Sequence, residues 1–442
     1  NSGGGLKEYM EVFESEPVVQ GGCIWDWVDQ SFREVDAHGK WYWAYGGDYG
    51  PENIPSFGNF CCNGLVNAVR EPHPHLKEVK KAYQYIKCTL KDSKNLTIAI
   101  KNWYDFTNLN AYVLKCSIVG DNGKMLAKGE QSIEVAPHAT TEVSLGGVRL
   151  PRNIREAYLN LSWTPKKKSA FIGTDDEVAY DQFVLPANSQ YRPTLAKLSE
   201  KPEIQIDPKT GALTSYIYEG QEYLASPVRL SLYRPATDND NREKKGGAKV
   251  WRKLGLNHLV QRVLSVKTSG HTTYSEVELL NDKNETIGSA TFEYTIRKDG
   301  ILSVQTRFVP DTTFVGSLAR VGLVFEMPHS FNRVTYLGRG EHETYADRKL
   351  SGRIGIYHTD AERMFHYYVR PQATGNRTDV RWMQVSDELG KGLSVWGEKS
   401  FEFSVSPFTD ENIDAAGHIN KLKRNGTVTV HLDALQSGVG TA

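Results

Sequence analysis

Hydrophobic and polar positions follow a helical period in the first residues. Apolar residues three and four positions apart, with charged residues between them, are Leu6, Tyr9, Met10 and Phe13. This spacing predicts an amphipathic helix over residues 6–14. Pro17 ends it, because proline cannot continue a helix.

The next stretch, residues 18–28, is a largely apolar run, VVQGGCIWDWV. It is too short and too rich in glycine and β-branched residues for a helix, so we expect a buried strand. A long glycine- and proline-rich segment then runs from Asp29 to about Pro74. Connections of more than about 15 residues are usually functional or disordered, and the many aromatic residues argue against disorder. A helical stripe resumes after it, at residues 76–83.

Beyond Cys88 the hydrophobic period changes to two. Alternating runs lie at residues 96–106, 112–130 and 156–163, and the second run contains the turn sequence Asp-Asn-Gly. Short strands separated by turns predict a β-sandwich of immunoglobulin-like size. A linker is expected near residues 186–203.

The remainder of the chain is also rich in strand patterns. Alternating runs at residues 292–296 and 302–308 flank the turn sequence Asp299-Gly300, and another lies at residues 428–432. No obvious linker divides this part, so we expect one large sandwich rather than two small ones.

Length and charge limit the class of protein. The chain has 442 residues, which suggests three domains of about 150 residues each. Lys plus Arg and Asp plus Glu both total 53, so no field of one sign favours nucleic acid or an anionic membrane. The chain lacks a run of about 18 apolar residues that could span a bilayer and a signal-peptide pattern. We therefore expect a soluble protein.

Two further features concern the chain as a whole. Five cysteines, all in the first third, are too few and odd in number for a disulfide framework. The chain enters its first helical pattern without an initiator methionine, and we interpret it as a fragment.

The segment GGCIWDWVDQSF, residues 21–32, is the first candidate site. In a strand Trp25 and Trp27 share one face and Asp26 points to the other. One interpretation is an aromatic core beneath a sheet, because tryptophan is mostly buried. The alternative is a sugar site at a strand end, where a flat indole packs on the C–H face of a ring and carboxylates take its hydroxyls.

The segment FCCNG, residues 60–64, allows three interpretations. Cys61 and Cys62 with His73 and His75 include enough ligands for zinc, but adjacent cysteines fit structural zinc spacings poorly. Asn63-Gly64 as a plain turn is the simpler alternative. The two histidines lie at a helix entrance fixed by prolines and need do nothing but pack.

Two charged segments lie in the last part of the chain, at residues 337–349 and 370–383. We interpret both as solvent-facing loops with internal ion pairs. Retaining glycosidases need an acid and a nucleophilic carboxylate about 5 Å apart, and we identify no such pair, so no catalytic residue is assigned.

Several motifs together resemble the large bacterial β-galactosidases of glycoside hydrolase family 2. They are GGCIWDWVDQSF, YWAYGGDYG (42–50), FCCNGLVNAVREPHPHLKEVK (60–80), YRPATDNDN (233–241), LGRGEHETYADR (337–348) and HLDALQSGVG (431–440). The resemblance implies a multidomain, mostly β protein. Residues 1–86 would end a TIM (β/α)8 barrel, 87–190 would form an immunoglobulin-like sandwich, and 200–442 the small-chain sandwich, which is galactose-mutarotase-like.

The resemblance also implies site residues. Trp25 would form the hydrophobic floor beneath the galactosyl ring, and the Phe60 carbonyl and the Asn63 side chain would be two ligands of a sodium ion. The nucleophilic and acid glutamates and the magnesium ligands would lie upstream of this chain, so the chain alone is expected to be inactive.

The implied activity is hydrolysis of terminal β-D-galactosyl bonds, as in lactose, by the intact enzyme. The implied partners are β-galactosides and either further copies of the chain or a complementing N-terminal segment, since an incomplete barrel exposes an apolar edge. The cytoplasm is favoured as compartment and the periplasm stays open. A non-catalytic carbohydrate-binding or scaffolding product is the alternative. Mutarotase-like chemistry would require a His–Glu pair such as His342 with Glu341 or Glu343.

Overall fold

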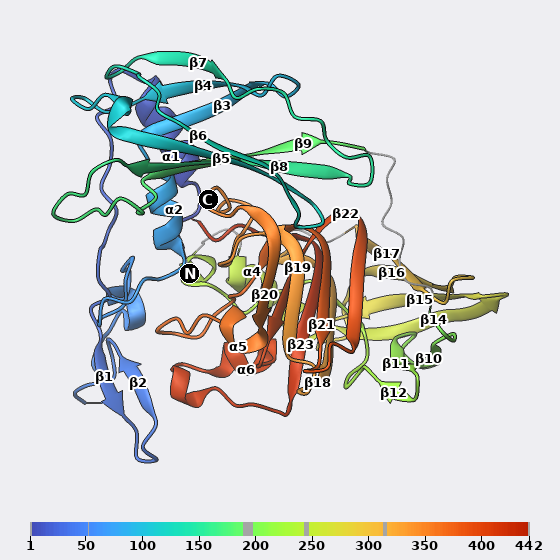
Figure 1. The fold of residues 1–442 in the computed structure, drawn as a ribbon. Helices are drawn as coiled ribbons and strands as arrows, with labels where there is room; N and C mark the ends of the chain where they lie inside the picture. Colours follow the sequence, from blue (N-terminus) through green and yellow to red (C-terminus); the bar gives the residue numbers. More distant parts are fainter. Residues whose placement is uncertain (1, 52, 189–197, 243–246, 313–315, 441–442) are drawn as a thin grey trace.

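The computed structural model describes residues 2–51, 53–188, 198–242, 247–312 and 316–440. Three parts follow one another along the chain and pack together (Figure 1). The predicted linker near residues 186–203 lies in part, at residues 189–197, outside the described residues. No described helix has the length and apolar character needed to cross a membrane.

The first part contains two helices, a hairpin and a short 3-10 turn. These elements are α1 (Leu6–Ser15), β1 (Phe32–Val35), β2 (Trp41–Ala44), η1 (Gly58–Cys61) and α2 (His75–Ala82). The predicted helix over residues 6–14 is confirmed as α1, and the stripe from Leu76 is confirmed as α2. The described residues of the segment from Asp29 to Pro74 contain the antiparallel β1–β2 hairpin, which the sequence did not predict.

The predicted buried strand over residues 18–28 is wrong. These residues form no strand, and Val28 makes only an isolated bridge to Val66. Val18 is 88% exposed. A strand is stable where a neighbouring strand satisfies its backbone groups, and no described strand lies beside this stretch.

The second part is a two-sheet sandwich, as the alternating pattern predicted. Its strands are β3 (Ile86–Asp92), β4 (Thr97–Asn102), β5 (Tyr112–Gly120), β6 (Met125–Gln131), β7 (Thr140–Ser144), β8 (Glu156–Pro165) and β9 (Ala179–Pro186), with η2 (Leu109–Ala111) before β5. They form the sheets β3-β4-β7 and β6-β5-β8-β9. One core shared by both sheets includes Ile98, Leu114 and Trp163, all fully buried.

The third part is one large sandwich, which confirms the prediction from its strand pattern. Its strands are β10 (Glu203–Ile206), β11 (Leu213–Tyr218), β12 (Gln221–Glu222), β13 (Arg229–Ser231), β14 (Val260–Ser269), β15 (Thr272–Leu280), β16 (Thr286–Ile296), β17 (Leu302–Pro310), β18 (Arg320–Pro328), β19 (Arg333–Arg339), β20 (Ile354–Asp360), β21 (Arg377–Ser386), β22 (Gly392–Ser406) and β23 (Thr427–Gln436). Its helices are α3 (Asp238–Arg242), α4 (Gly247–Lys253), η3 (Leu256–His258), α5 (Ala361–Met364), α6 (Asp410–Ala415) and η4 (Ile419–Lys421).

Two sheets enclose the core of this sandwich. The seven-stranded sheet has the order β13-β18-β23-β22-β21-β19-β20, and the four-stranded sheet has the order β14-β15-β16-β17. Val277 and Phe292 of the smaller sheet and Phe325 and Phe403 of the larger sheet belong to one buried cluster. This shared core is the reason that the third part forms one unit.

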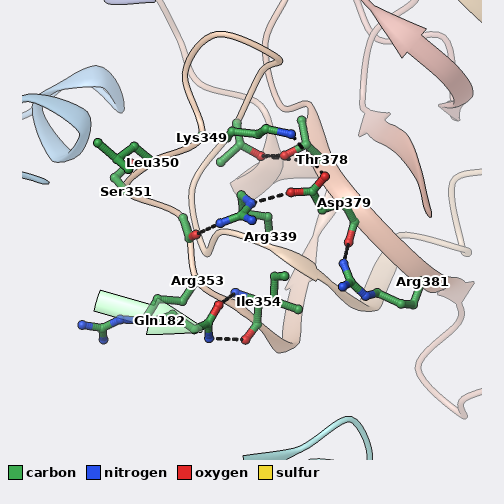
Figure 2. Close-up of polar contacts among 12 residues, drawn as sticks. Gln182, Arg339, Lys349, Leu350, Ser351, Arg353, Ile354, Thr378, Asp379 and Arg381 are labelled. Atoms are coloured by element: carbon green, nitrogen blue, oxygen red, sulfur yellow. Dashed lines mark hydrogen bonds and ion pairs between the residues drawn. The ribbon is translucent and has the colours of Figure 1, made fainter. Parts of the chain in front are cut away.

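The segment 339–354 joins the sandwich to the other parts. Figure 2 shows Gln182 of β9 exchanging two hydrogen bonds with the backbone of Ile354, of 2.9 and 2.7 Å. Within the sandwich, Arg339 donates to Asp379 (2.6 Å) and to the carbonyl of Gly352 (2.8 Å). The two Gln182–Ile354 hydrogen bonds fix the second part against the third.

Candidate functional site

Trp25 lies in a loop that the FCCNG turn holds in place. The backbone N–H of Asp26 donates to the carbonyl of Asn63 (3.2 Å), and that of Gln30 donates to the carbonyl of Cys61 (2.9 Å). The peptide bond between Trp25 and Asp26 is cis. Trp25 is 78% exposed and Trp27 is 59% exposed, so an aromatic core beneath a sheet is not formed here. The indole of Trp25 is available to a ligand.

The FCCNG turn brings Phe60 and Asn63 into direct contact. The side-chain amide of Asn63 donates to the carbonyl oxygen of Phe60 (2.6 Å). The turn is anchored to the sandwich, because the amide of Asn59 donates to Asp238 (2.8 Å) at the start of α3. The two residues expected to bind sodium are therefore adjacent to each other and to the loop of Trp25.

These two residues fit a hard cation in part. The carbonyl oxygen of Phe60 and the amide oxygen of Asn63 are ligands of the type that hard cations prefer. The amide of an asparagine can be turned to present either oxygen or nitrogen, so the Asn63 oxygen can replace the nitrogen beside Phe60. Two oxygens make only part of a coordination shell.

The zinc alternative is wrong for the described residues. His73 bonds to Asp29 and His366, and His75 bonds to the carbonyl of Gly64 (3.0 Å). No group of three or more His, Cys, Asp or Glu side chains in the described ranges is arranged to hold a metal ion. Burial raises the pKa of the Cys62 thiol, which disfavours the thiolate that zinc needs.

A buried network of hydrogen bonds that the sequence did not predict connects this site to the sandwich. Nε2 of His73 lies 2.6 Å from a carboxylate oxygen of Asp29, and its Nδ1 lies 2.8 Å from Nε2 of His366. The other Asp29 oxygen accepts from the backbone N–H of Gly64 (2.7 Å). His73 therefore does more than pack: it ties the Trp25 loop to the sandwich. The sequence could have indicated Asp29 as a site residue, because it is an acid directly after an apolar run. Nothing in the sequence indicates that it would be linked to His366.

The interpretation of residues 337–349 and 370–383 as solvent-facing loops is wrong. Glu343 and Arg348 are 3% and 2% exposed, and their side chains form an ion pair of 2.5 Å. Glu343 also accepts from Tyr368 (2.5 Å), Thr374 (2.6 Å) and the N–H of Gly375 (2.7 Å). Burial alone would raise the pKa of Glu343, but the charge of Arg348 and these donors hold it well below its usual value.

The His–Glu pair needed for mutarotase-like chemistry is not formed by the residues proposed. His342 is turned to the hydroxyl of Ser351 (2.8 Å), and burial lowers its pKa to about 3. Glu343 is committed to Arg348, and Glu341 is exposed and lies 3.7 Å from Lys77. This alternative was therefore wrong for these positions.

The carboxylates beside Trp25 do not form an acid–nucleophile pair. Asp29 is buried and both its oxygens are engaged, while one oxygen of Asp26 accepts from Gln30 (2.9 Å). The arrangement can offer an exposed indole and carbonyl-type oxygens to a polar ring-shaped ligand, but it provides no proton donor and nucleophile for glycoside cleavage.

Models of known protein families match nearly the whole chain. Residues 199–442 match the beta galactosidase small chain, residues 98–186 match domain 4 of beta-galactosidase, and residues 1–88 match the TIM barrel domain of glycosyl hydrolases family 2. The chain belongs to the family 2 β-galactosidases, of which it forms a C-terminal part. The resemblance inferred from the motifs and the multidomain, mostly β fold class are confirmed.

Individual relatives agree with this assignment. A beta-galactosidase of Priestia megaterium is 34% identical over 458 residues, and beta-galactosidase 2 of Enterobacter cloacae is 30% identical over 469 residues. Each match covers 100% of this chain and 44% of the relative. The match to an exo-chitosanase structure of Amycolatopsis orientalis covers 76% of this chain and 29% of the exo-chitosanase chain at 10% identity. Its TM-score of 0.21 is too low to indicate a shared fold.

Proposed function

We propose that this chain is the part of a retaining β-galactosidase that supplies the galactosyl platform and part of a sodium site. The observation that carries the proposal is the exposed indole of Trp25, 78% exposed and held beside Asn63 and Phe60 by the Asp26–Asn63 backbone hydrogen bond of 3.2 Å. An aromatic face beside oxygen ligands suits a sugar, whose C–H face is apolar and whose edge carries hydroxyls.

Each residue has a distinct role in this proposal. Trp25 packs under the galactosyl ring and excludes water from one face. The Phe60 carbonyl and the Asn63 amide oxygen would hold the sodium ion, which when bound attracts a hydroxyl of the substrate. Asp29, His73 and His366 are positioning residues, because they fix the loop that carries Trp25.

Hydrolysis needs groups that we do not assign to this chain. The family chemistry uses a glutamate acid that protonates the leaving oxygen and a glutamate nucleophile about 5 Å away. We propose that these glutamates, and the magnesium ligands, come from the portion of a β-galactosidase that the matched 44% does not cover. The substrate of the completed enzyme would be a β-galactoside such as lactose.

A complementation assay tests this function. A chromogenic β-galactoside is incubated with this chain alone, and then with the chain mixed with a separately made N-terminal segment that carries the two glutamates. The proposal predicts turnover only in the mixture, increased by sodium. Turnover by the chain alone would contradict the assignment of the glutamates.

The exposure of Trp25 in this chain also favours a second function, carbohydrate binding without catalysis. A mixture that binds galactose through Trp25 but never turns over a β-galactoside, at any sodium or magnesium concentration, would support this function over the first.

A further inference from the structure

A cavity of about 330 Å³ lies in the large sandwich, and none of the residues that line it belongs to the first part. It is bounded by β13, η3, β18 and α6, and Thr429 of β23 also lines it. Val428 and Val430 belong to the core, so Thr429 and His431 lie on the opposite, polar face of the seven-stranded sheet. The cavity therefore opens on a polar sheet face.

Helix α6 presents two carboxylates to this cavity. Asp410 and Asp414 both line it and are four residues apart, which places them on one side of the helix. Thr409 fixes the start of the helix, because its side chain accepts from the N–H of Asn412. The separation of the two acids is thus set by regular secondary structure.

Cationic or hydroxyl groups lie close to both carboxylates. Asp414 accepts from Tyr233 (2.7 Å) and Arg252 (3.1 Å). Asp410 lies 3.2 Å from Nε2 of His431 and 3.9 Å from Arg320. A carboxylate can accept about four hydrogen bonds, so each retains acceptor capacity. Groups oriented in this way are preorganised for a ligand.

Most of the carboxylates around the cavity already have a cationic or hydrogen-bonding partner. Arg252 and Arg320 lie 3.1 and 3.9 Å from the two α6 carboxylates, and Glu326 accepts a hydrogen bond from Asn425 (2.8 Å). Arg229 adds a positive charge to the lining, and Glu411 is exposed. Burial alone would raise the pKa of Asp410, but the nearby charges of His431 and Arg320 outweigh burial and lower it, so it stays ionised. Paired carboxylates of this kind accept hydrogen bonds from hydroxyl groups without requiring a counter-charge.

The remaining walls complete the chemistry of a sugar site. Val324 and the ring of Tyr233 provide an apolar wall, while Arg229, Asn257 and His258 add polar groups. An apolar wall with a few convergent polar groups is the usual form of a small-molecule site, and a volume near 300 Å³ is at the small end of the range. We propose that this cavity is a second carbohydrate site, which takes one neutral hexose ring and is independent of the Trp25 platform.

Binding of D-galactose to the 442-residue chain tests this proposal. Trp25→Ala first removes the platform, and D-galactose is then titrated by calorimetry and by ligand-observed NMR. Ala415 is exposed and lines the cavity, so Ala415→Trp in the same background fills its mouth. The proposal predicts that the Trp25→Ala chain still binds D-galactose and that Ala415→Trp weakens this binding at least about tenfold.

Two further variants make the result specific. Ala170→Trp adds the same side chain at an exposed loop position of the second part, and it is expected to leave binding unchanged. Asp410→Asn keeps the shape of the wall but removes a charged acceptor, so it should weaken binding even if Ala415→Trp fails to fold. Absence of D-galactose binding to the Trp25→Ala chain, or equal binding by folded Ala415→Trp, would overturn the proposal.

Discussion

Two buried carboxylates face each other across neighbouring strands of the large sandwich. Glu402 of β22 and Asp433 of β23 are register partners, 7% and 1% exposed. Burial raises the pKa of Glu402 to about 7; the hydrogen bond from Asn376 (2.7 Å) opposes this shift and the charge of Asp433 adds to it. The pKa of Asp433 is also raised, chiefly by burial. Deprotonation of Glu402 therefore creates a buried negative charge beside that of Asp433, which is unfavourable.

The pH dependence of stability should reveal this pair. Because the pKa of Glu402 rises from 4.5 unfolded to about 7 folded, its protonated form favours the folded state, and this contribution is lost as the pH rises from about 4.5 to 7. The loss is at most about 3 kcal/mol. Glu402→Gln should remove it, so that urea unfolding of the variant and the wild type differs more at pH 8 than at pH 5. The exposed Glu388→Gln is the control. An unchanged pH profile in Glu402→Gln would contradict this prediction.

The Glu343–Arg348 pair should contribute strongly to stability. Removing one partner of a buried ion pair leaves an uncompensated charge and costs about 3–5 kcal/mol. We expect Glu343→Ala to show this loss in urea unfolding, whereas Glu388→Ala, at an exposed pair with Arg333 (3.2 Å), should lose far less. Equal losses would show that the Glu343 network adds no more than a surface pair.

Helix α2 joins the first part to both sandwiches. Glu78 is 2% exposed, and its carboxylate accepts from the N–H groups of Leu350 (2.9 Å) and Ser351 (2.8 Å) and from the Ser351 hydroxyl (2.6 Å). One turn later, Lys81 pairs with Asp181 of β9 (2.7 Å). One helix thus contacts both sandwiches.

Loss of the Glu78 contacts should loosen α2 locally. We expect Glu78→Ala to increase amide hydrogen exchange in α2 and at residues 350–351, because three hydrogen bonds are lost there. Lys77→Ala, which removes only an exposed contact with Glu341 (3.7 Å), is the matched control. Unchanged exchange in Glu78→Ala would mean that apolar packing alone holds the helix.

Local sequence patterns predicted individual helices and strands reliably. They did not predict which segments find a neighbouring strand to pair with. Strands β16, β17 and β23 were predictable because alternation and turn residues act over a few positions. The expected strand at residues 18–28 was not formed, since a strand depends on neighbours that its own sequence does not specify. The burial of Glu343 was missed for a related reason: Tyr368 and Thr374, which satisfy it, are distant in sequence.

At the scale of the whole molecule, apolar side chains gather on the first part. Those that are exposed there are Tyr9, Val12, Val18, Trp25, Trp27, Phe32, Val35, Trp41, Tyr49, Ile54, Phe57, Phe60, Val69, Tyr83 and Tyr85. About half of the exposed large apolar side chains of the described residues thus lie on the first part, where the sequence led us to expect an apolar edge. Surfaces of this kind usually mark a site of association.

Association through this surface is a prediction of the account. We expect the chain alone to self-associate in sedimentation velocity, and an added N-terminal segment to reduce self-association by covering the surface. Phe57→Asp, at a side chain 92% exposed on this part, should weaken self-association. Phe106→Asp, at a side chain 96% exposed on the second part, should not. The same effect from both variants would place the contact elsewhere.

The candidate site was predictable only in part. The motifs of the chain led to Trp25, Phe60 and Asn63, and the structure places these residues together through the Asp26–Asn63 and Asn63–Phe60 hydrogen bonds. The supporting residues Asp238 and His366 were not predictable, because they come from the sandwich and reach the site only through the tertiary fold.

The proposed role of Trp25 as the platform for a galactosyl ring can be tested by a single kinetic measurement. It is kcat/KM for a chromogenic β-galactoside in the complemented mixture, with Trp25→Ala and with the neighbouring exposed Trp27→Ala as control. We expect a decrease of at least about tenfold for Trp25→Ala, because the loss of ring stacking (about 1 kcal/mol) adds to the loss of buried apolar area, and a tenfold change corresponds to about 1.4 kcal/mol. Little change is expected for Trp27→Ala. Equal values for the two variants would contradict this role of Trp25.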